Sequence, residues 1–322
     1  MACEEVFTVQ LSLFDLHCDT ASELYLQKKS LLSNDLHVGL DKLSPFEHYA
    51  QVFAVYTDSS LSDEDGYTVF HQIADHFDRE LVRCAEHIGL ARNGDEISDL
   101  WKSGRHAAIL AVEDARLLSG DLGRLRVLYD RGVRFLTLTW AGVTSIGGSW
   151  DTSKGLTDFG CDTVRECFRL GIVPDVSHAS EQTADGIMEI AYEYRKPFIA
   201  SHSNSHSLYA HPRNLCDRHF EGIKELGGIV GVSLCPGHLC KSTERRGTVE
   251  DIFAHIDHYL AMGGEDIVGF GADWDGTDLP DGISTVGDLT LVAEIMARHN
   301  YTDELIEKIY WKNFYNFSIK NL

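Results

Sequence analysis

Eight short runs of apolar residues recur along the chain, and longer amphipathic stretches separate them. The runs cover residues 11–16, 51–56, 107–112, 135–139, 172–175, 197–200, 228–234 and 267–270. Near-continuous apolar strands that alternate with helices are typical of parallel βαβ units, which are buried on both faces. Eight such units predict a (β/α)8 TIM-like barrel, which needs roughly 250 residues. We expect one barrel domain over residues 1–322; an open, doubly wound sheet is the competing fold.

Helix-like patterns fill the intervals between the apolar runs. They cover residues 67–89, 123–132, 162–171, 181–194, 217–226, 249–263 and 287–299. Three of them end at Gly132, Gly171 or Gly263, and glycine is the residue that favours the C-terminal end of a helix. Extra C-terminal helices, over 302–311 and the last few residues, are expected to lie outside the barrel.

The charge balance excludes several classes of partner. The chain has 28 Lys and Arg against 50 Asp and Glu, a formal net charge of −22. Nucleic acids and anionic membranes attract clustered basic residues, so neither is expected as a partner. No apolar run approaches the roughly 20 residues of a membrane helix. The first residues show no signal-peptide pattern, and the eight cysteines form no CxxC pair, so we expect a cytoplasmic protein with free thiols.

Polar residues follow the first apolar run, at the end where barrel active sites are built. Strand alternation places His17 and Asp19 on one face and Cys18 on the other. An imidazole and a carboxylate aimed at one point are two good ligands for Zn²⁺. A buried histidine hydrogen-bonded to a nearby aspartate is the structural alternative, and Cys18 is expected to pack rather than to ligate.

Four further runs end in the same residue types. Glu113 closes the third run, where an unpaired carboxylate would be costly, and Asp114 is expected to cap the next helix. His178, His202 and Asp273 follow the fifth, sixth and eighth runs. Three histidines and three carboxylates on one rim predict a site for two divalent metals, with a bridging carboxylate and a bridging water suited to hydrolysis.

Other catalytic motifs are absent from the sequence. It has no G-x-S-x-G elbow, no Walker A motif, no strand-linked G-x-G-x-x-G and no H-E-x-x-H. A serine beside the histidines, such as Ser201 or Ser203, would need a dedicated base to act as a nucleophile. The histidines are better explained as metal ligands.

Five segments in order carry these residues or lie between them: 14–19 (FDLHCD), 175–178 (DVSH), 200–204 (ASHSN), 211–214 (HPRN) and 271–276 (GADWDG). They resemble the renal (membrane) dipeptidase family, peptidase family M19 of the amidohydrolase superfamily. Segments 132–139 (GVRFLTLT) and 155–160 (GLTDFG) add to the resemblance, which runs from about residue 13 to residue 314. It implies a TIM-like barrel with a binuclear zinc site, a hydrolase of the metalloprotease class that cleaves dipeptides through a metal-bridging hydroxide. The family also often forms homodimers.

The resemblance further implies a role for each residue. His17 and Asp19 would hold one Zn²⁺, His178 and His202 the other, and Glu113 would bridge the two. Asp273 would contact the bridging water as general acid and base. Arg213 would grip the C-terminal carboxylate of the substrate through its planar fork. From the sequence alone, an arginine after His-Pro is more often a surface or salt-bridge residue.

One position departs from the family pattern. Many members have a histidine after the Leu-Thr of the fourth run, where it polarises the scissile carbonyl, and this chain has Trp140. Trp140 offers an indole N–H donor but cannot become cationic. Three explanations stay open: the indole is a weaker donor, a neighbouring residue substitutes, or the substrate differs.

Two alternatives to a dipeptidase remain at the level of sequence. A related amidohydrolase would open a lactam, a lactone or an N-acyl amino acid with the same metal site, and Arg213 and the loop after Trp140 would discriminate between substrates. A non-catalytic binding barrel would have kept the six metal-site residues without using them. A purely structural role for the six is disfavoured, because so many buried ionisable groups would destabilise a barrel without metal.

Overall fold

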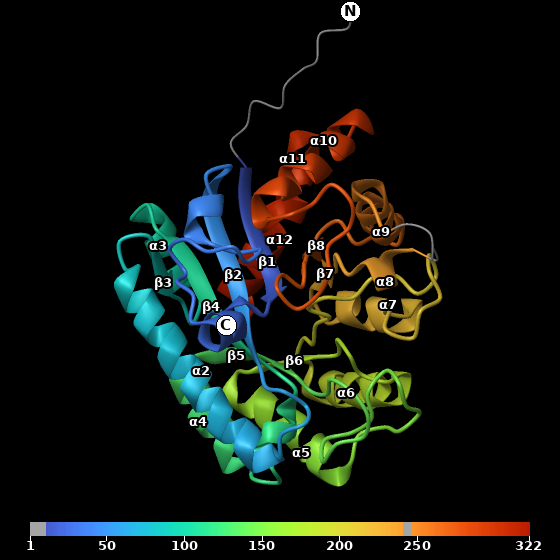
Figure 1. Ribbon diagram of the computed structural model, residues 1–322. Coiled ribbons are helices and arrows are strands. Elements are labelled where there is room, and N and C mark those ends of the chain that lie inside the picture. Colours follow the sequence, from blue (N-terminus) through green and yellow to red (C-terminus); the bar gives the residue numbers. More distant parts are fainter. Residues whose placement is uncertain (1–10, 241–245) are drawn as a thin grey trace, which may run out of the picture.

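The computed structural model describes residues 11–240 and 246–322, and its framework is a curled parallel sheet (Figure 1). Neighbouring strands follow the order β6-β5-β4-β2-β1-β8-β7, and β3 pairs with the first residues of β4. The strands are β1 (Leu11–Cys18), β2 (Phe46–Tyr56), β3 (Ile88–Leu90), β4 (His106–Glu113), β5 (Val133–Thr137), β6 (Val173–Asp175), β7 (Val230–Val232) and β8 (Val268–Phe270).

A short extended segment at residues 199–200 closes the sheet into a barrel. Ile199 forms a parallel bridge with Asp175 of β6, and Ala200 forms one with Val230 of β7. All eight apolar runs of the sequence therefore lie in the barrel wall, seven as strands and one as this bridging segment. The predicted (β/α)8 architecture is confirmed, and the open sheet is excluded. β3, which the sequence did not predict, extends the sheet beside β4.

Helices surround the wall, and each helical segment predicted from the sequence has a counterpart among them. Their bounds are α1 (Thr20–Gln27), α2 (Asp63–Arg83), α3 (Gly94–Lys102), α4 (Gly123–Arg131), α5 (Asp158–Leu170), α6 (Glu181–Tyr194), α7 (Asp217–Glu225), α8 (Pro236–Leu239), α9 (Val249–Ala261), α10 (Thr290–Arg298), α11 (Asp303–Glu307) and α12 (Asn313–Asn321). Short 3-10 turns cover Leu40–Lys42, Ala115–Leu118 and Val286–Leu289, and a π-turn covers Lys308–Lys312 between α11 and α12. Gly132, Gly171 and Gly263 have the positive φ that ends a helix, as predicted.

Burial on both faces explains why the strands read as continuous apolar runs. Leu11 and Leu13 of β1 pack into one hydrophobic cluster, whereas Phe14 and Leu16 pack into a second. The same strand carries the buried polar side chain of Asp15 between them, and that residue serves the site described below.

The fold bears on two expectations, the absence of a membrane-spanning helix and the presence of free thiols. Within the described residues, no helix combines the length and apolar character needed to span a membrane. The seven cysteines of the described part are free thiols, and Cys18 is buried as expected; Cys3 lies outside the described residues. The single-domain boundary stays a prediction.

Candidate metal centre

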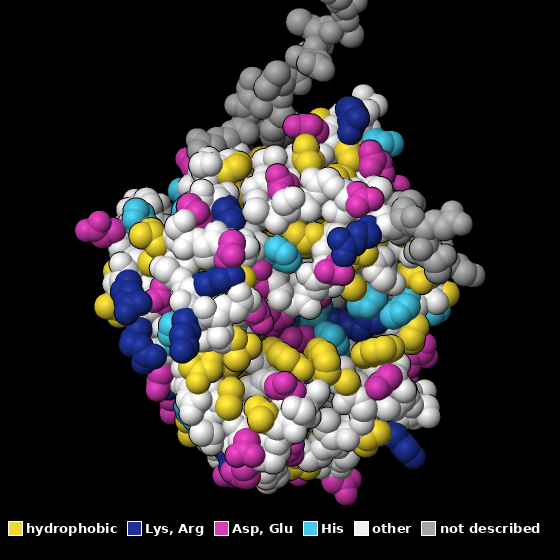
Figure 2. Space-filling model, in the orientation of Figure 1, with side chains coloured by type: hydrophobic (Ala, Val, Ile, Leu, Met, Phe, Trp, Pro, Cys, Tyr) yellow, Lys and Arg dark blue, Asp and Glu magenta, His cyan; other side chains and the backbone are white. Residues whose placement is uncertain are grey.

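Six ionisable side chains meet at the carboxyl ends of the barrel strands. His17 lies near the end of β1 and Asp19 follows that strand. Glu113 ends β4, His178 follows β6, His202 follows the bridging segment, and Asp273 follows β8. In Figure 2, acidic side chains line the bottom of a hollow in the visible face, with histidines beside them and hydrophobic side chains along one rim. The structure thus brings together the six predicted residues.

Glu113 lies between two groups of ligands. Its Oε1 is 2.9 Å from Nε2 of His178 and 3.5 Å from Nε2 of His202. Its Oε2 faces the other way and is 3.6 Å from Nε2 of His17. The two oxygens of one buried carboxylate therefore serve two different sets of donors, which is the arrangement of a bridging ligand.

His17 contacts the acidic half of the site. Its Nε2 lies 3.7 Å from Asp19 Oδ2 and 3.8 Å from Asp273 Oδ1, in addition to its distance from Glu113. These separations are too long for hydrogen bonds, and the Nε2 atom is buried without a hydrogen-bond partner. The donor atoms of His17, Asp19 and Glu113 lie within 4.8 Å of one another, as do those of Glu113, His178 and His202.

The electrostatics of the site suit bound cations. Burial lowers the pKa of His17, but the charges of Glu113 and Asp19 outweigh burial and raise that pKa well above its ordinary value. Burial, together with the charge of Glu113, raises the pKa of Asp19 to about 7. Burial also raises the pKa of Asp273 to about 6. Three carboxylates so close together repel one another when ionised, and divalent cations between them would keep all three ionised.

The histidines of the other half are held neutral. Burial lowers the pKa of His178 to about 4, with a further contribution from the charge of Arg213. Burial likewise lowers the pKa of His202 well below its ordinary value. His178 Nε2 and His202 Nε2 lie 2.9 Å apart, and both face Glu113. Neutral imidazole nitrogens that converge beside a carboxylate fit a zinc ligand set, so these residues fit the predicted pair of metal ions.

Local backbone strain accompanies the ligands. His178 and Asp273 both have a φ of 66°, a left-handed conformation that residues other than glycine seldom adopt. Strain of this kind is concentrated at functional sites, where the surrounding structure enforces it. Gly276 adds a steric requirement, because a Cβ there would overlap the carboxylate oxygens of Asp19 and Asp273.

Two buried aspartates hold the strand ends in place. Asp15 accepts hydrogen bonds from the backbone N–H groups of His17 (2.9 Å) and Ala272 (3.2 Å). It thereby ties the end of β1 to the segment that carries Asp273. This role of Asp15 was not predicted, although an aspartate within an apolar strand is a signal for a buried polar network.

Asp175 holds in place the two segments that carry His178 and His202. Its Oδ1 accepts from the backbone N–H groups of Ser177 and Ser201, each at 2.9 Å. Its Oδ2 accepts from the hydroxyl groups of Thr137 (2.7 Å) and Ser201 (2.5 Å). Since Ser177 and Ser201 directly precede His178 and His202, Asp175 is a positioning residue for both. The Ser201 hydroxyl also lies 2.7 Å from Nδ1 of His202, which directs Nε2 of that ring toward the site.

Arg213 is buried close to the metal centre. Its Nη1 donates to Ser203 Oγ at 3.1 Å, whereas its Nε and Nη2 are buried without a hydrogen-bond partner. Burial lowers its pKa, and the charges of Asp273 and Glu113 oppose that effect. Unpaired buried donors on a guanidinium are costly, and a substrate carboxylate would satisfy two of them at once.

Trp140 borders a cavity of about 390 Å³ that opens onto the centre. Its ring lies 5.0 Å from that of Tyr56 and 6.1 Å from that of His178, measured between centroids. Asp19 and Glu113 line the same cavity. The volume falls in the range of small-molecule sites, and Trp140 is placed where it would contact a bound molecule.

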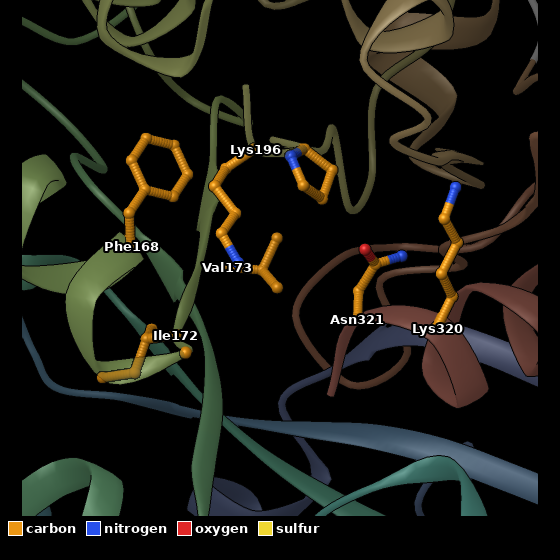
Figure 3. A pocket seen from close by; sticks show the side chains of 8 residues that line it. Phe168, Ile172, Val173, Lys196, Lys320 and Asn321 are labelled. Atoms are coloured by element: carbon orange, nitrogen blue, oxygen red, sulfur yellow. The ribbon is translucent and has the colours of Figure 1, made fainter. Parts of the chain in front are cut away.

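A second cavity lies near the start of β6, at the end of that strand opposite to the metal centre (Figure 3). It encloses about 90 Å³, and its lining includes Phe168, Lys196 and Lys320 but no histidine, cysteine or carboxylate. It cannot hold the predicted metals, so the chemistry belongs to the cavity beside Trp140.

The amino-acid sequence matches a known protein family. The model of the membrane dipeptidase family (peptidase family M19) matches residues 2–317. An uncharacterised protein in the pqqA 5′ region of Klebsiella pneumoniae is 32% identical over 219 residues, which are 65% of this chain and 79% of that protein. An uncharacterised dipeptidase of Schizosaccharomyces pombe is 32% identical over 242 residues, 71% of this chain but 55% of the yeast protein.

Solved structures with the same fold include two metallopeptidases. One is a metallopeptidase from Rhodobacter sphaeroides liganded with a phosphinate mimic of the dipeptide L-Ala-D-Ala. It has a TM-score of 0.90 and 26% identity, and the match covers 98% of this chain and all of that one. The other is a dipeptidase of family M19, with a TM-score of 0.89 and 27% identity over 97% of this chain and 99% of that one.

Proposed function

This chain belongs to the membrane dipeptidase family, peptidase family M19, and we propose that it hydrolyses dipeptides with two zinc ions held at the barrel mouth. It is a metal-dependent hydrolase of the dipeptidase type, as are its family and its structural neighbours. The observation that carries the proposal for two metals is Glu113, whose Oε1 faces His178 and His202 while its Oε2 faces His17.

The ligands would divide between the two ions as the family resemblance implies. His17 and Asp19 would hold one Zn²⁺, His178 and His202 the other, and Glu113 both. A pair of such ions, when bound, supplies Lewis acidity and lowers the pKa of a water toward neutrality. Asp273 faces the same space, and its carboxylate would take a proton from the attacking water and pass it to the leaving amine.

Arg213 favours a substrate with a free carboxylate. Its unpaired Nε and Nη2 donors would bind the C-terminal carboxylate of a dipeptide as a fork, which fixes the peptide bond relative to Asp273. A simple lactone offers no such group, so Arg213 gives no support to lactone opening; an N-acyl amino acid carries the same carboxylate and is separated from a dipeptide only by assay. Trp140 would contact the bound dipeptide, and whether its indole N–H donates to the scissile carbonyl is tested below.

The decisive experiment measures metal content and hydrolysis together. We expect two zinc ions per chain and turnover of L-Ala-L-Ala or L-Ala-D-Ala, with Asp273→Asn retaining the metals and losing turnover. A protein with two bound metals that hydrolyses no dipeptide in a broad panel would refute the proposal.

A second experiment isolates Arg213. The C-terminal amide of the preferred dipeptide lacks the carboxylate, so the wild-type protein should hydrolyse it with a much larger KM than the free acid. An Arg213→Met variant should no longer distinguish the two substrates, whereas Arg213→Lys should keep part of the preference as a point charge. Equal discrimination by wild type and Arg213→Met would rule out the carboxylate contact.

A further inference from the structure

A cysteine, a histidine and an aspartate form a hydrogen-bonded chain outside the metal centre. Cys216 lies at the N-terminal end of α7, and His219 is in the first turn of that helix. The Sγ of Cys216 is 3.0 Å from Nδ1 of His219, and Nε2 of His219 is 2.8 Å from Oδ1 of Asp185. Asp185 belongs to α6, which packs against α7 (Figure 1). None of the three residues has a part in the proposed dipeptidase reaction.

The geometry determines where the protons lie. An ionised carboxylate only accepts hydrogen bonds, so Asp185 requires the proton of the neutral imidazole to be on Nε2. Nδ1 is then the acceptor for the thiol proton of Cys216. When that proton moves across, the imidazolium donates from both nitrogens, to the thiolate and to Asp185. Cys216 is thus placed as the nucleophile, His219 as its base, and Asp185 as the carboxylate that orients the base, which is the arrangement of an activated thiol.

The surroundings also favour the thiolate. The guanidinium of Arg218 pairs with Asp185 and keeps the carboxylate ionised. Burial raises the pKa of the Cys216 thiol, but the hydrogen bond and charge of His219 outweigh burial and bring that pKa below its ordinary value, with Glu181 of α6 opposing. The N-terminus of α7, a helix of nine residues, adds positive potential beside the sulfur.

A small cleft gives access to the pair. Cys216 and His219 line it together with Arg213 and Ser203, and its free volume of about 20 Å³ is the size of roughly one water molecule. Cys216 itself is partly exposed. The cleft is too small for a peptide, so a second peptidase site is excluded, whereas the partly exposed sulfur can be reached from solvent by an oxidant as small as hydrogen peroxide.

We propose that Cys216 is an activated thiol that His219 and Asp185 hold ready for oxidation by hydrogen peroxide or a small hydroperoxide. The sulfur attacks one peroxide oxygen, the O–O bond breaks, and the sulfur is oxidised to a sulfenic acid while the peroxide is reduced. The His219 imidazolium gives its Nδ1 proton to the departing oxygen, which leaves as water or an alcohol. The thiolate, the peroxide and that proton account for every atom of the products.

The modification also acts on the dipeptide site, a consequence that rests on the proposed function. Arg213 is three residues before Cys216 and lines the same cleft. An oxygen added to the sulfur occupies that narrow space and displaces the segment that carries Arg213. The KM for a dipeptide should then rise at least about tenfold, the factor expected when one hydrogen bond between charged groups is lost, with a smaller change in kcat.

The first test needs no enzymatic activity. The metal-loaded protein is treated briefly with hydrogen peroxide, quenched with catalase and denatured, and the remaining thiols are alkylated with iodoacetamide and counted by peptide mass spectrometry. Cys161 on α5 is the internal reference, because it is also partly exposed but burial raises its pKa. Cys216 should be lost at least about tenfold faster, the ratio that one pKa unit gives in thiolate content. Loss of Cys216 no faster than of Cys161 overturns the proposal.

Two variants test the partners of the thiol. Asp185→Asn and His219→Gln should each slow oxidation of Cys216 about tenfold and leave Cys161 unchanged. The Asp185 side chain is 30% exposed, so its variant should fold even if the one at buried His219 does not. An unchanged rate for Cys216 in folded Asp185→Asn overturns the role of the chain of hydrogen bonds.

The link to the dipeptide site is measured with Cys216→Ser as control. Peroxide should raise the KM of the wild-type protein and leave that of Cys216→Ser unchanged. A wild-type KM that stays constant when Cys216 is fully oxidised refutes this link. Should the protein hydrolyse no dipeptide at all, the proposed function fails, and the thiol counts still decide whether Cys216 is activated.

Discussion

Asp175 should contribute more to stability than any surface charge of this chain. It is 1% exposed and accepts four hydrogen bonds, two of them from the backbone N–H groups before His178 and His202. Asp175→Ala leaves both N–H groups buried without an acceptor, at about 1–3 kcal/mol each. The hydroxyl groups can rotate toward other partners. We therefore expect the free energy of unfolding to fall by about 4 kcal/mol.

Asp175→Asn is the matched control. The amide oxygen can still accept from both N–H groups, and the amide NH2 can donate to the Thr137 and Ser201 hydroxyl groups once these rotate to accept. The main loss is then the charge of the acceptor, about 1 kcal/mol for each backbone bond. Its free energy of unfolding should therefore fall by about 2 kcal/mol. Urea denaturation of metal-free protein measures both values, and titration with Zn²⁺ should show weaker binding in both, by about 10–100-fold for a residue that orients metal ligands. Equal stability of wild type and Asp175→Ala, or equal losses in the two variants, would refute the reasoning.

Three further predictions concern single residues. Burial lowers the pKa of His255 from 6.5 to about 4, so the unfolded chain binds one more proton than the folded chain between these two pH values. This contribution to stability, about 3 kcal/mol, should be complete above pH 6.5 and lost as the pH falls to about 4. His255→Gln should flatten this pH dependence of the free energy of unfolding, measured by urea titrations. Trp140→Phe keeps an aromatic ring at this position but removes the indole N–H, and kcat should fall about 100-fold with little change in KM if that group polarises the carbonyl. An unchanged kcat assigns the role elsewhere. Gly276→Ala should retain the fold by circular dichroism but lose bound zinc by elemental analysis, because the new Cβ displaces Asp19 and Asp273; full zinc occupancy would contradict this.

The barrel could be predicted from the sequence because its strands are buried on both faces. Each wall segment stands out as an apolar run, and even the segment at 199–200, which makes only isolated bridges, was predicted in this way. Two short elements were not predicted. The first residues of β3 (Ile88–Leu90) fall within the helix predicted over 67–89, and α8 has four residues, too few to show a helical period.

The metal centre could be predicted because its residues follow the strands directly. His17, Glu113 and Asp273 each stand at a recognisable strand end, where a polar side chain is unexpected. The roles of Asp15 and Asp175 could not be predicted, because their hydrogen-bond donors come from neighbouring strands. For the same reason Cys216 and Asp185 gave no signal, since 31 residues of chain separate them and only the packing of α6 on α7 brings both to His219.

The barrel wall is uneven, so the two proposed zinc ions are expected to differ in how readily they dissociate. β1, β2 and β4 have eight to eleven residues, whereas β6 and β7 have three each, with only isolated bridges joining them through residues 199–200. Local opening should begin at this seam, where strand pairing is reduced to isolated bridges. The seam separates His178 from His202, while His17 and Asp19 stand on the long-strand wall. The ion held by the two histidines should therefore leave first on chelation, and amide hydrogen exchange around residues 199–202 should rise with its release.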